Sequence, residues 1–589
     1  MLSPWNNRLD TTVYYNENDR NSRYHRLYRQ VPNQKFDQSL FFSLQSAKFN
    51  PQVYFELLAT AAIFEVSTVL LLLCVVTLLA FWTRNWSVPY PTIMVLVGGI
   101  LALVPGLPDV QLTPDIVFLV FLPPLLYAAA WQTNLREFVY NLRPITMLAL
   151  GLVLVTTMVV AWVTKFFVPE MPWAAAFALG AIISPPDAIA ATSITQRLRV
   201  PKRIVVILEG ESLLNDASGL VAYRLAVAVA AGELFSWQGA LSYFVIVCAG
   251  GLAIGCIVGW LVIQVHKRLD DPVIETVCTL MTPYAAYIVS ESIHCSGVLA
   301  CVCAGLLVRS QAIELFSAPT RLHATAVWES VVFVLTGLTF IFIGLGLRSV
   351  VVSIRSESNL GPYLWTTLAV LVATVVVRLA WIFPAAWLPR LLIPGLKSRD
   401  PIPPASHLLM IGWTGMRGVV SLAAAMALPS DFPFRNMILF VVFGVILGTL
   451  VIQGISLPFL VRALGIAGGG RSGMEQEIDA RLALLAEANL FLEMQQSAGI
   501  SSEEVEYLRT HFRTQSDAWL SRLGLEEEGG LIENQSGICQ RTYLRTMHRQ
   551  RHRLHQMARD SLIDESTVQK LERELDMEES RLTSVTRKP

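Results

Sequence analysis

The stretch ALGAIISPPDAIAATSITQRLRVPKRIVVILEGESLLND, residues 178–216, decides how the rest of this chain is interpreted. It joins two apolar segments, about 173–195 and 204–231, and each of them carries an aspartate, Asp187 or Asp216. A charged side chain at bilayer depth costs about 2.5–3.5 kcal/mol or more, so aspartates inside apolar segments indicate a functional site. The two segments therefore predict a pair of carboxylates held inside a membrane.

Two prolines, Pro185 and Pro186, stand directly before Asp187. A helix does not continue intact through adjacent prolines, because each lacks an N–H group and its ring clashes with the preceding turn. Carbonyls freed by such a break are tolerated at membrane depth only where protein buries them or a water-filled cavity meets them. A broken helix with one carboxylate beside a second helix with another predicts a cation site.

Composition and hydropathy place the whole chain among polytopic membrane proteins. Of its 589 residues 53% are hydrophobic and 15% are charged, against about 25% charged in an average soluble domain. Mean hydropathy is +0.51, and the apolar runs suit the roughly 20 residues that cross a bilayer as a helix. An all-α membrane protein is therefore expected. Its thirteen spans are expected near 56–82, 91–108, 116–131, 144–168, 173–195, 204–231, 237–265, 272–290, 297–308, 327–347, 361–388, 405–428 and 436–465.

Polar segments flank this apolar part at both ends. Residues 1–52 are polar and contain no apolar core of signal-peptide type, so they are expected to form a flexible tail. Residues 53–466 are expected to form the transmembrane domain. Residues 467–589 are charged with a helical pattern, which predicts a small cytosolic regulatory domain after the Gly468–Gly470 hinge. Lys and Arg concentrate in the loops after the odd-numbered spans, so those loops and the C-terminus are expected in the cytoplasm.

The sixth expected span carries two pairs of polar residues. Ser212 and Asp216 share one helix face at a spacing of four, and Glu211 and Asn215 share another. Glu211 lies about 140° from Asp216 at 100° per residue, so the two carboxylates point at different neighbours. Glu211 is therefore expected in an ion pair rather than in cation binding.

The twelfth expected span, SHLLMIGWTGMRGVVSLAAAMAL (406–428), contains the charge that would meet Glu211. Arg417 cannot lie inside a membrane without a carboxylate or several carbonyls around it, and Glu211 is its expected partner. Gly412 and Gly415 weaken this helix, so the fifth and twelfth spans are both expected to be interrupted. Paired interrupted helices predict a transporter built from inverted repeats, with its site at the membrane midplane.

Four motifs together resemble a known family. SPPDA (184–188), GESLLNDASGLV (210–221) and GMRG (415–418) follow FLPPLLYAAAW (121–131) in that order. They are similar to the monovalent cation/proton antiporter family of the sodium/proton exchanger type, its bacterial branch in particular. Many relatives carry an acid in the third span where Tyr127-Ala128-Ala129 stand here, which leaves cation selectivity open.

The resemblance implies that Asp187, Asn215 and Asp216 form the ion site, with Na⁺ held at the two aspartates. Ser212 is implied as a further ligand through its hydroxyl group. The family's buried glutamate–arginine pair corresponds here to the Glu211–Arg417 pair expected above. A homodimer is implied as well, in which a core domain moves against a dimerisation domain.

The expected function is secondary active exchange of Na⁺ for H⁺ across the cell membrane. Desolvation lets a buried carboxyl hold a proton near neutral pH, so proton and cation compete for one site. With alternating access, one proton exchanged for one Na⁺ moves no net charge, so exchange is expected to be electroneutral. The resemblance implies the same, because Asn215 precedes the second aspartate as it does in the family's electroneutral members. An exchanger for K⁺ or Li⁺ and an uncoupled cation channel stay open as alternatives, whereas an aspartyl protease lacks its Tyr-Asp and Gly-x-Gly-Asp contexts. No cofactor, enzymatic activity or nucleic-acid partner is expected.

Overall fold

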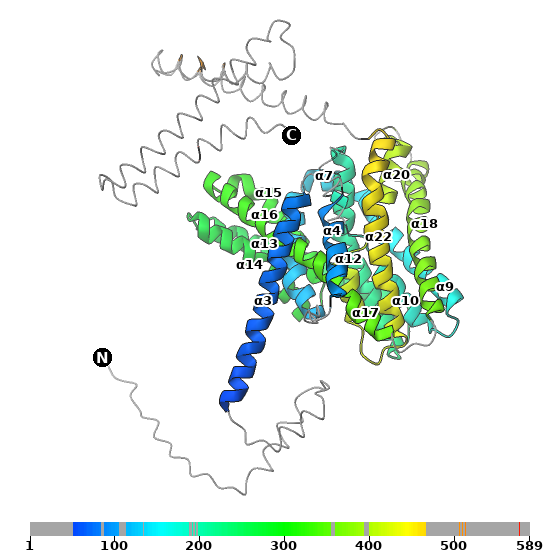
Figure 1. Ribbon diagram of the computed structural model, residues 1–589. Helices are drawn as coiled ribbons and strands as arrows, with labels where there is room; N and C mark the ends of the chain where they lie inside the picture. The colour runs from blue at the N-terminus through cyan, green and yellow to red at the C-terminus, as the bar shows by residue number, and fades with distance from the viewer. Residues whose placement is uncertain are drawn as a thin grey trace, which may run out of the picture. The chain divides into compact units, whose positions relative to one another are not determined.

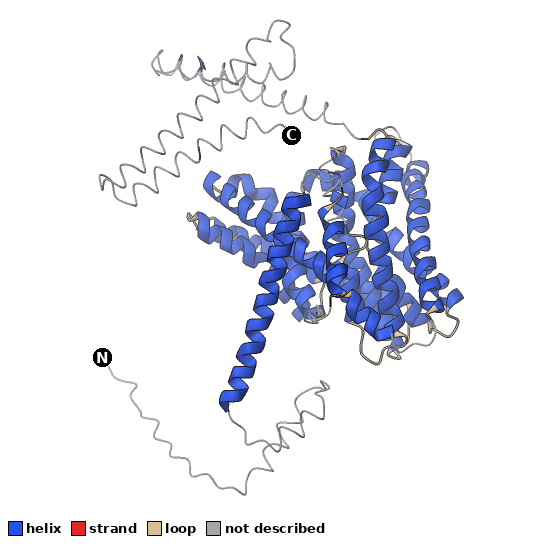
Figure 2. Ribbon diagram, viewed as in Figure 1, coloured by secondary structure: helices blue, strands red, loops and turns tan. Residues whose placement is uncertain are grey.

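The described part of the chain is helical throughout, with no strand among its regular elements (Figure 2). This confirms the expected all-α class for that part. The chain divides into two compact units, Met1–Val75 and Val76–Pro589. The expected tail 1–52, apart from Pro51 and Gln52, and the expected domain 467–589 fall outside the continuous described ranges. The computed structural model describes residues 51–83, 88–104, 113–133, 135–187, 200–354, 360–393 and 400–466, with a few isolated positions elsewhere.

The first unit contributes most of α3 (Pro51–Thr83), a long apolar helix. In the second unit, every expected apolar segment of the described part contains helix (Figure 1). Its elements in chain order are α4 (Tyr90–Ala102), α5 (Pro114–Ile116), η3 (Val117–Phe121), α6 (Leu122–Gln132), α7 (Leu135–Tyr140), α8 (Leu142–Thr146), η4 (Met147–Leu152), α9 (Val153–Phe167), α10 (Trp173–Ile183), α12 (Lys202–Ala230), α13 (Trp237–His266), α14 (Pro272–Ser292), α15 (Gly297–Leu315), α16 (Ala318–Leu345), α17 (Leu347–Ile354), α18 (Gly361–Leu392), α20 (Ala405–Trp413), α21 (Val419–Met426) and α22 (Arg435–Ala463).

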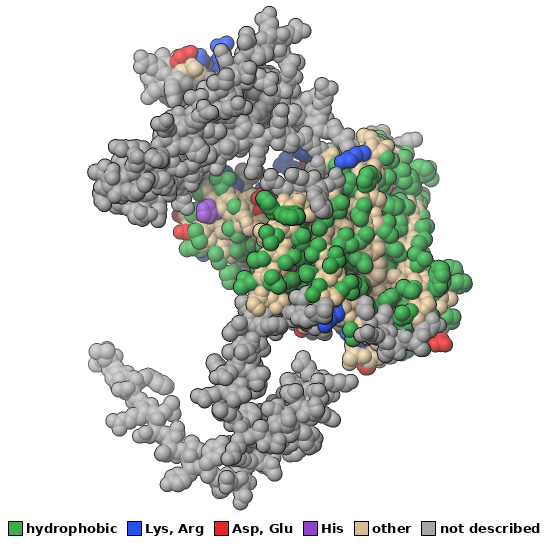
Figure 3. Space-filling view, viewed as in Figure 1, with side chains coloured by type: hydrophobic (Ala, Val, Ile, Leu, Met, Phe, Trp, Pro, Cys, Tyr) green, Lys and Arg blue, Asp and Glu red, His purple; other side chains and the backbone are tan. Residues whose placement is uncertain are grey.

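Helix length and apolar surface identify an integral membrane protein. Eight helices of the described part are long and apolar enough to cross a membrane, and four shorter apolar helices accompany them. Hydrophobic side chains cover most of the face seen in Figure 3, and the charged side chains visible on the described part lie toward its edges. The count of thirteen spans stays a prediction.

Two helices differ from their expected form for reasons in the sequence. The third span opens as a π-helix, Val117–Phe121, because Pro123 and Pro124 have no N–H groups to continue the regular ladder. One freed carbonyl, that of Val120, accepts a hydrogen bond of 3.3 Å from the Tyr284 hydroxyl of α14. Helix α15 continues past Arg309 to Leu315, so the short ninth span is longer than 297–308.

Close helix contacts in the second unit depend on glycine. A Cβ atom at Gly98 of α4 would meet the Ile341 carbonyl of α16, and one at Gly344 would meet the Val95 carbonyl in return. The two helices therefore touch backbone to backbone. Helix α12, which carries the expected site residues Ser212, Asn215 and Asp216, contacts both α10 and α21. These contacts bring the two interrupted helices beside the helix that carries Asp216.

Candidate functional site

The first interruption lies where the paired prolines predicted it. Helix α10 ends at Ile183, and the chain runs non-helically through Pro185, Pro186 and Asp187. Ser184 turns back on the helix end, and its hydroxyl donates to the Ala181 carbonyl at 3.1 Å. The break therefore leaves the last carbonyls of α10 without intrahelical donors, at a buried position.

The second interruption separates α20 from α21 and meets the first. Residues 414–418 are non-helical, and the Asp187 N–H donates to the Met416 carbonyl at 2.7 Å. Gly418 is essential to this approach, because a Cβ atom there would overlap the Asp187 carboxyl group. The two breaks thus touch where Asp187 lies. The expected interruption of both helices is confirmed, with Gly415 inside the second break and Gly412 in the last turn of α20.

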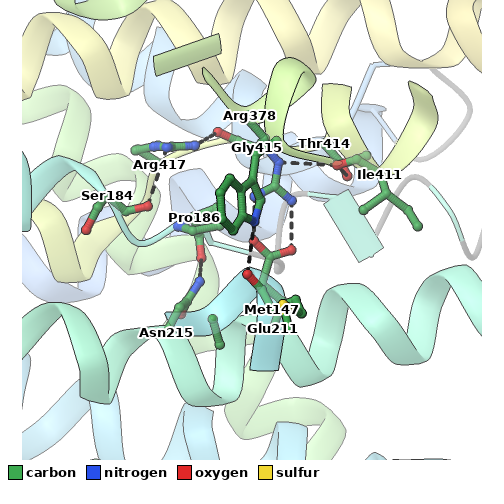
Figure 4. Close-up of polar contacts among 12 residues, drawn as sticks. Met147, Ser184, Pro186, Glu211, Asn215, Arg378, Ile411, Thr414, Gly415 and Arg417 are labelled. Atoms are coloured by element: carbon green, nitrogen blue, oxygen red, sulfur yellow. Dashed lines mark hydrogen bonds and ion pairs between the residues drawn. The ribbon is translucent and has the colours of Figure 1, made fainter. Parts of the chain in front are cut away.

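Arg417 is buried within the second break and caps the first (Figure 4). Its Nε donates to the Ile183 carbonyl at 2.9 Å, and Nη2 donates to the Ser184 carbonyl at 3.4 Å. Nη1 donates to the Gly415 carbonyl of its own break. The guanidinium therefore donates hydrogen bonds to carbonyls at the C-terminal end of α10, where the helix dipole favours a cation.

The expected Glu211–Arg417 ion pair is wrong, because Glu211 pairs with Arg378 of α18. Arg378 Nη1 and Nη2 lie 2.5 and 2.8 Å from the two Glu211 oxygens, and both side chains are 1% exposed (Figure 4). Arg378 Nε also donates to the Ile411 carbonyl of α20 at 3.2 Å. Arg417 donates to several carbonyls, so the Glu211 carboxylate is left to pair with the other buried arginine, Arg378.

Asn215 and Asp216 lie in the middle of α12, opposite the first break. The Asn215 amide nitrogen donates to the Pro186 carbonyl at 3.0 Å, whereas its buried Oδ1 has no hydrogen-bond partner among the described residues. Asp216 is buried and Asp187 is half-buried. A buried acceptor oxygen without a partner, on the residue next to Asp216, has the chemistry of a cation ligand.

One cavity brings together three of the four expected ligands, and Asn215 is not among the residues that line it. It encloses about 920 Å³ of space, its open mouth included, and Asp187, Ser212 and Asp216 all line it. Pro185, Pro186 and Gly418 of the two breaks form part of the same wall. The remaining wall is largely apolar and comes from α6 and α21.

Four polar residues that line this cavity were not expected: Gln132, Thr192, Glu209 and Ser421. Glu209 lines it from α12, and Ser421 lines it from α21 with a hydroxyl that has no partner among the described residues. Glu209, Ser212 and Asp216 follow one another at spacings of three and four, which is the spacing of one helix face. That spacing is the signal in the sequence that could have identified Glu209.

Comparisons with known proteins identify the family of the chain. The transmembrane sodium/hydrogen exchanger family matches residues 68–463. An uncharacterised Na⁺/H⁺ exchanger of Mycobacterium tuberculosis is 32% identical over 513 residues, which cover 85% of this chain and 93% of its own. The sodium, potassium, lithium and rubidium/H⁺ antiporter of Bacillus subtilis is 33% identical over 396 residues, 63% of this chain and 58% of its own.

A solved structure shares the fold. The sodium proton antiporter of Methanocaldococcus jannaschii at pH 8 superimposes with a TM-score of 0.53 at 16% sequence identity, covering 68% of this chain and 99% of that one. The family match spans more than half of the chain, and it includes both interrupted helices and the cavity between them. This chain therefore belongs to the sodium/hydrogen exchanger family.

Proposed function

We propose that this protein exchanges Na⁺ for protons across a membrane by competition at Asp187 and Asp216. The observation that carries the proposal is the single cavity lined by both aspartates at the point where two helix breaks touch. Relatives are named as Na⁺/H⁺ exchangers or antiporters, and the Bacillus subtilis relative is named for four alkali cations. A K⁺- or Li⁺-proton exchanger of the same mechanism is therefore the second candidate.

Three side chains that line the cavity, and Asn215 next to Asp216 in the chain, have different roles in binding. The carboxylates of Asp187 and Asp216 supply negative charge, whereas Ser212 and the Asn215 Oδ1 atom supply neutral oxygen ligands. Partial burial makes two adjacent negative charges costly, so the site holds either a proton or a cation in preference to neither. The pairing of Glu211 with Arg378 keeps that charge out of the exchange.

Transport follows if the loaded site is exposed alternately to each side of the membrane. The empty site carries more negative charge than the loaded one and crosses less readily, which couples cation movement to proton movement. Exchange of one proton for one Na⁺ moves no net charge across the membrane, so exchange is electroneutral. A homodimer in the cell membrane with a cytoplasmic C-terminus completes the proposal, and regulation by residues 467–589 goes with it.

The test is sodium-driven proton movement in proteoliposomes that contain a pH-sensitive dye. Asp216→Asn and Asp187→Asn should each abolish it, because one titratable ligand is removed without a change of shape. Asp431→Asn is the matched control, since Asp431 is exposed and lies outside the cavity. Robust exchange by purified Asp216→Asn would contradict the mechanism.

The same vesicles separate exchange from the channel alternative. An exchanger moves protons only when a cation moves in the opposite direction. Cation flux that is accompanied by no opposite movement of protons would favour an uncoupled channel. Replacing Na⁺ by K⁺ or Li⁺ in turn ranks the cations.

A further inference from the structure

A second polar cluster lies away from the cation cavity, and we call it the Asp400 cluster. It consists of Arg143, Arg203, Arg390 and Asp400. Arg143 lies at the start of the span Leu142–Phe167, Arg203 in the first turn of α12 and Arg390 in the last turn of α18. Each arginine therefore lies where an apolar span ends, which is the level of lipid headgroups.

The three arginines share one carboxylate. Arg203 Nη2 lies 2.8 Å from one Asp400 oxygen, Arg390 Nη2 lies 2.7 Å from the other, and Arg143 Nη2 contacts that second oxygen as well. Asp400 is the only carboxylate that pairs with these arginines in the part of the chain that the structure describes. Three guanidinium groups against one carboxylate leave the cluster with excess positive charge.

Part of the hydrogen-bonding capacity of these arginines is unused. Arg390 uses all three nitrogens, because Nε donates to the Asp400 carbonyl at 2.8 Å and Nη1 donates to the Ala386 carbonyl. Arg143 bonds only through Nη2, and Arg203 leaves Nη1 without a bond to any described residue. The side chains of Arg143 and Arg203 are 25% and 36% exposed, so their open donors are accessible from outside.

An apolar cavity adjoins the cluster. It encloses about 460 Å³ of space, mouth included, and all three arginines line it. Its other lining residues are apolar, among them Leu148, Ile207, Ile382, Pro403 and Leu408. A rim of arginines over an apolar wall is suited to a ligand with an anionic head and a hydrocarbon body.

We propose that the Asp400 cluster binds the phosphate headgroup of an anionic phospholipid. A guanidinium fork matches the oxygens of a phosphate group, and the apolar wall favours a lipid over a free phosphate ion. The arginine-rich loops predict the cytoplasmic side, where the leaflet is rich in anionic lipid. The headgroup joins the ends of α8, α12 and α18, and α12 carries Asp216.

Lipid-dependent thermal stability of the full-length protein in detergent tests the site without any transport measurement, so it does not depend on the proposed function. Phosphatidylglycerol should raise the Tm in a saturable way, whereas phosphatidylcholine should not. The double variant Arg143→Gln/Arg203→Gln should bind phosphatidylglycerol at least about tenfold more weakly, the loss expected from one or two charge-assisted hydrogen bonds. Each variant is compared with its own Tm in phosphatidylcholine, so a lower basal stability does not obscure the result.

Arg268→Gln is the matched control, because Arg268 is an exposed arginine in another loop on the side predicted to be cytoplasmic. It should keep the full response to phosphatidylglycerol. Equal effects of the two lipids on the unaltered protein, or a full response in the double variant, would overturn the proposal. A full response to sodium phosphate alone would assign the cluster to a free phosphate ion and would overturn the proposal of a lipid ligand.

Discussion

Removal of either partner of the Glu211–Arg378 pair should destabilise the protein severely. Both side chains are 1% exposed, and two hydrogen bonds of 2.5 and 2.8 Å join them. Breaking a buried pair on one side strands the other charge, at a cost of about 3–5 kcal/mol. Glu211→Gln and Arg378→Met should therefore each lower the free energy of unfolding by about that amount.

A double-mutant cycle measures whether the two residues touch. Equilibrium unfolding in mixed micelles is followed for both single variants and for Glu211→Gln/Arg378→Met, which strands no charge. The double variant should lose less than the sum of the single losses, by about 2 kcal/mol or more. The same cycle with Arg417 should show a smaller coupling, because Arg417 bonds to carbonyls. Additivity within about 0.5 kcal/mol for Glu211 and Arg378, or a larger coupling with Arg417, would refute the assignment.

Three further predictions use the same preparations. Gly418→Ala should lose exchange activity, because the added Cβ overlaps the Asp187 carboxyl group. Gly99→Ala is the control, since Gly99 has room for a methyl group. Normal exchange by Gly418→Ala would contradict the contact between the two breaks at Asp187. Burial tends to raise the pKa of Asp400, but Arg203, Arg390 and Arg143 lower it below its usual range. The stability that Asp400 contributes is therefore fully present above about pH 4 and is lost as pH falls through the lowered pKa, so Asp400→Asn should cost about 2 kcal/mol at pH 7 and less in acid. Sodium-coupled proton flux should not change with a potassium diffusion potential of either sign, and a rate that depends on polarity would show that exchange is not electroneutral.

Local backbone chemistry made the two breaks predictable from the sequence. Adjacent prolines supply no N–H groups to the helical ladder, so Pro185 and Pro186 predict a disturbance there, and α10 ends at Ile183. The same pair at Pro123 and Pro124 only distorts its helix into a π-helical turn, so the pair by itself does not decide between a distortion and a full break. Gly415 and Gly418 also weaken a helix locally, and both lie in the second break. Helical spacing also placed Ser212 and Asp216 on one face, and both line one cavity in the structure.

The partner of Glu211 could not be predicted in the same way. Arg378 and Arg417 both lie within apolar spans, and which of them faces Glu211 depends on how α12, α18 and the second break pack together. Arg378 interrupts an apolar run, but it belongs to no motif that would indicate its role. Two of the three carbonyls that hold Arg417 come from residues 183 and 184, more than 230 positions away in the chain. Such long-range contacts leave no periodic pattern in the sequence.

Five backbone carbonyls at the two breaks already accept hydrogen bonds from the protein. Arg417 occupies those of Ile183, Ser184 and Gly415, Asn215 occupies that of Pro186, and the Asp187 N–H occupies that of Met416. A cation that enters the cavity therefore finds mostly side-chain oxygens and cannot shed its whole hydration shell for a cage of backbone dipoles. An ion that keeps part of its water presents a similar outer surface whether it is Li⁺, Na⁺ or K⁺. We expect shallow discrimination among alkali cations and fast release, which are properties of an exchanger that works at high cation concentration.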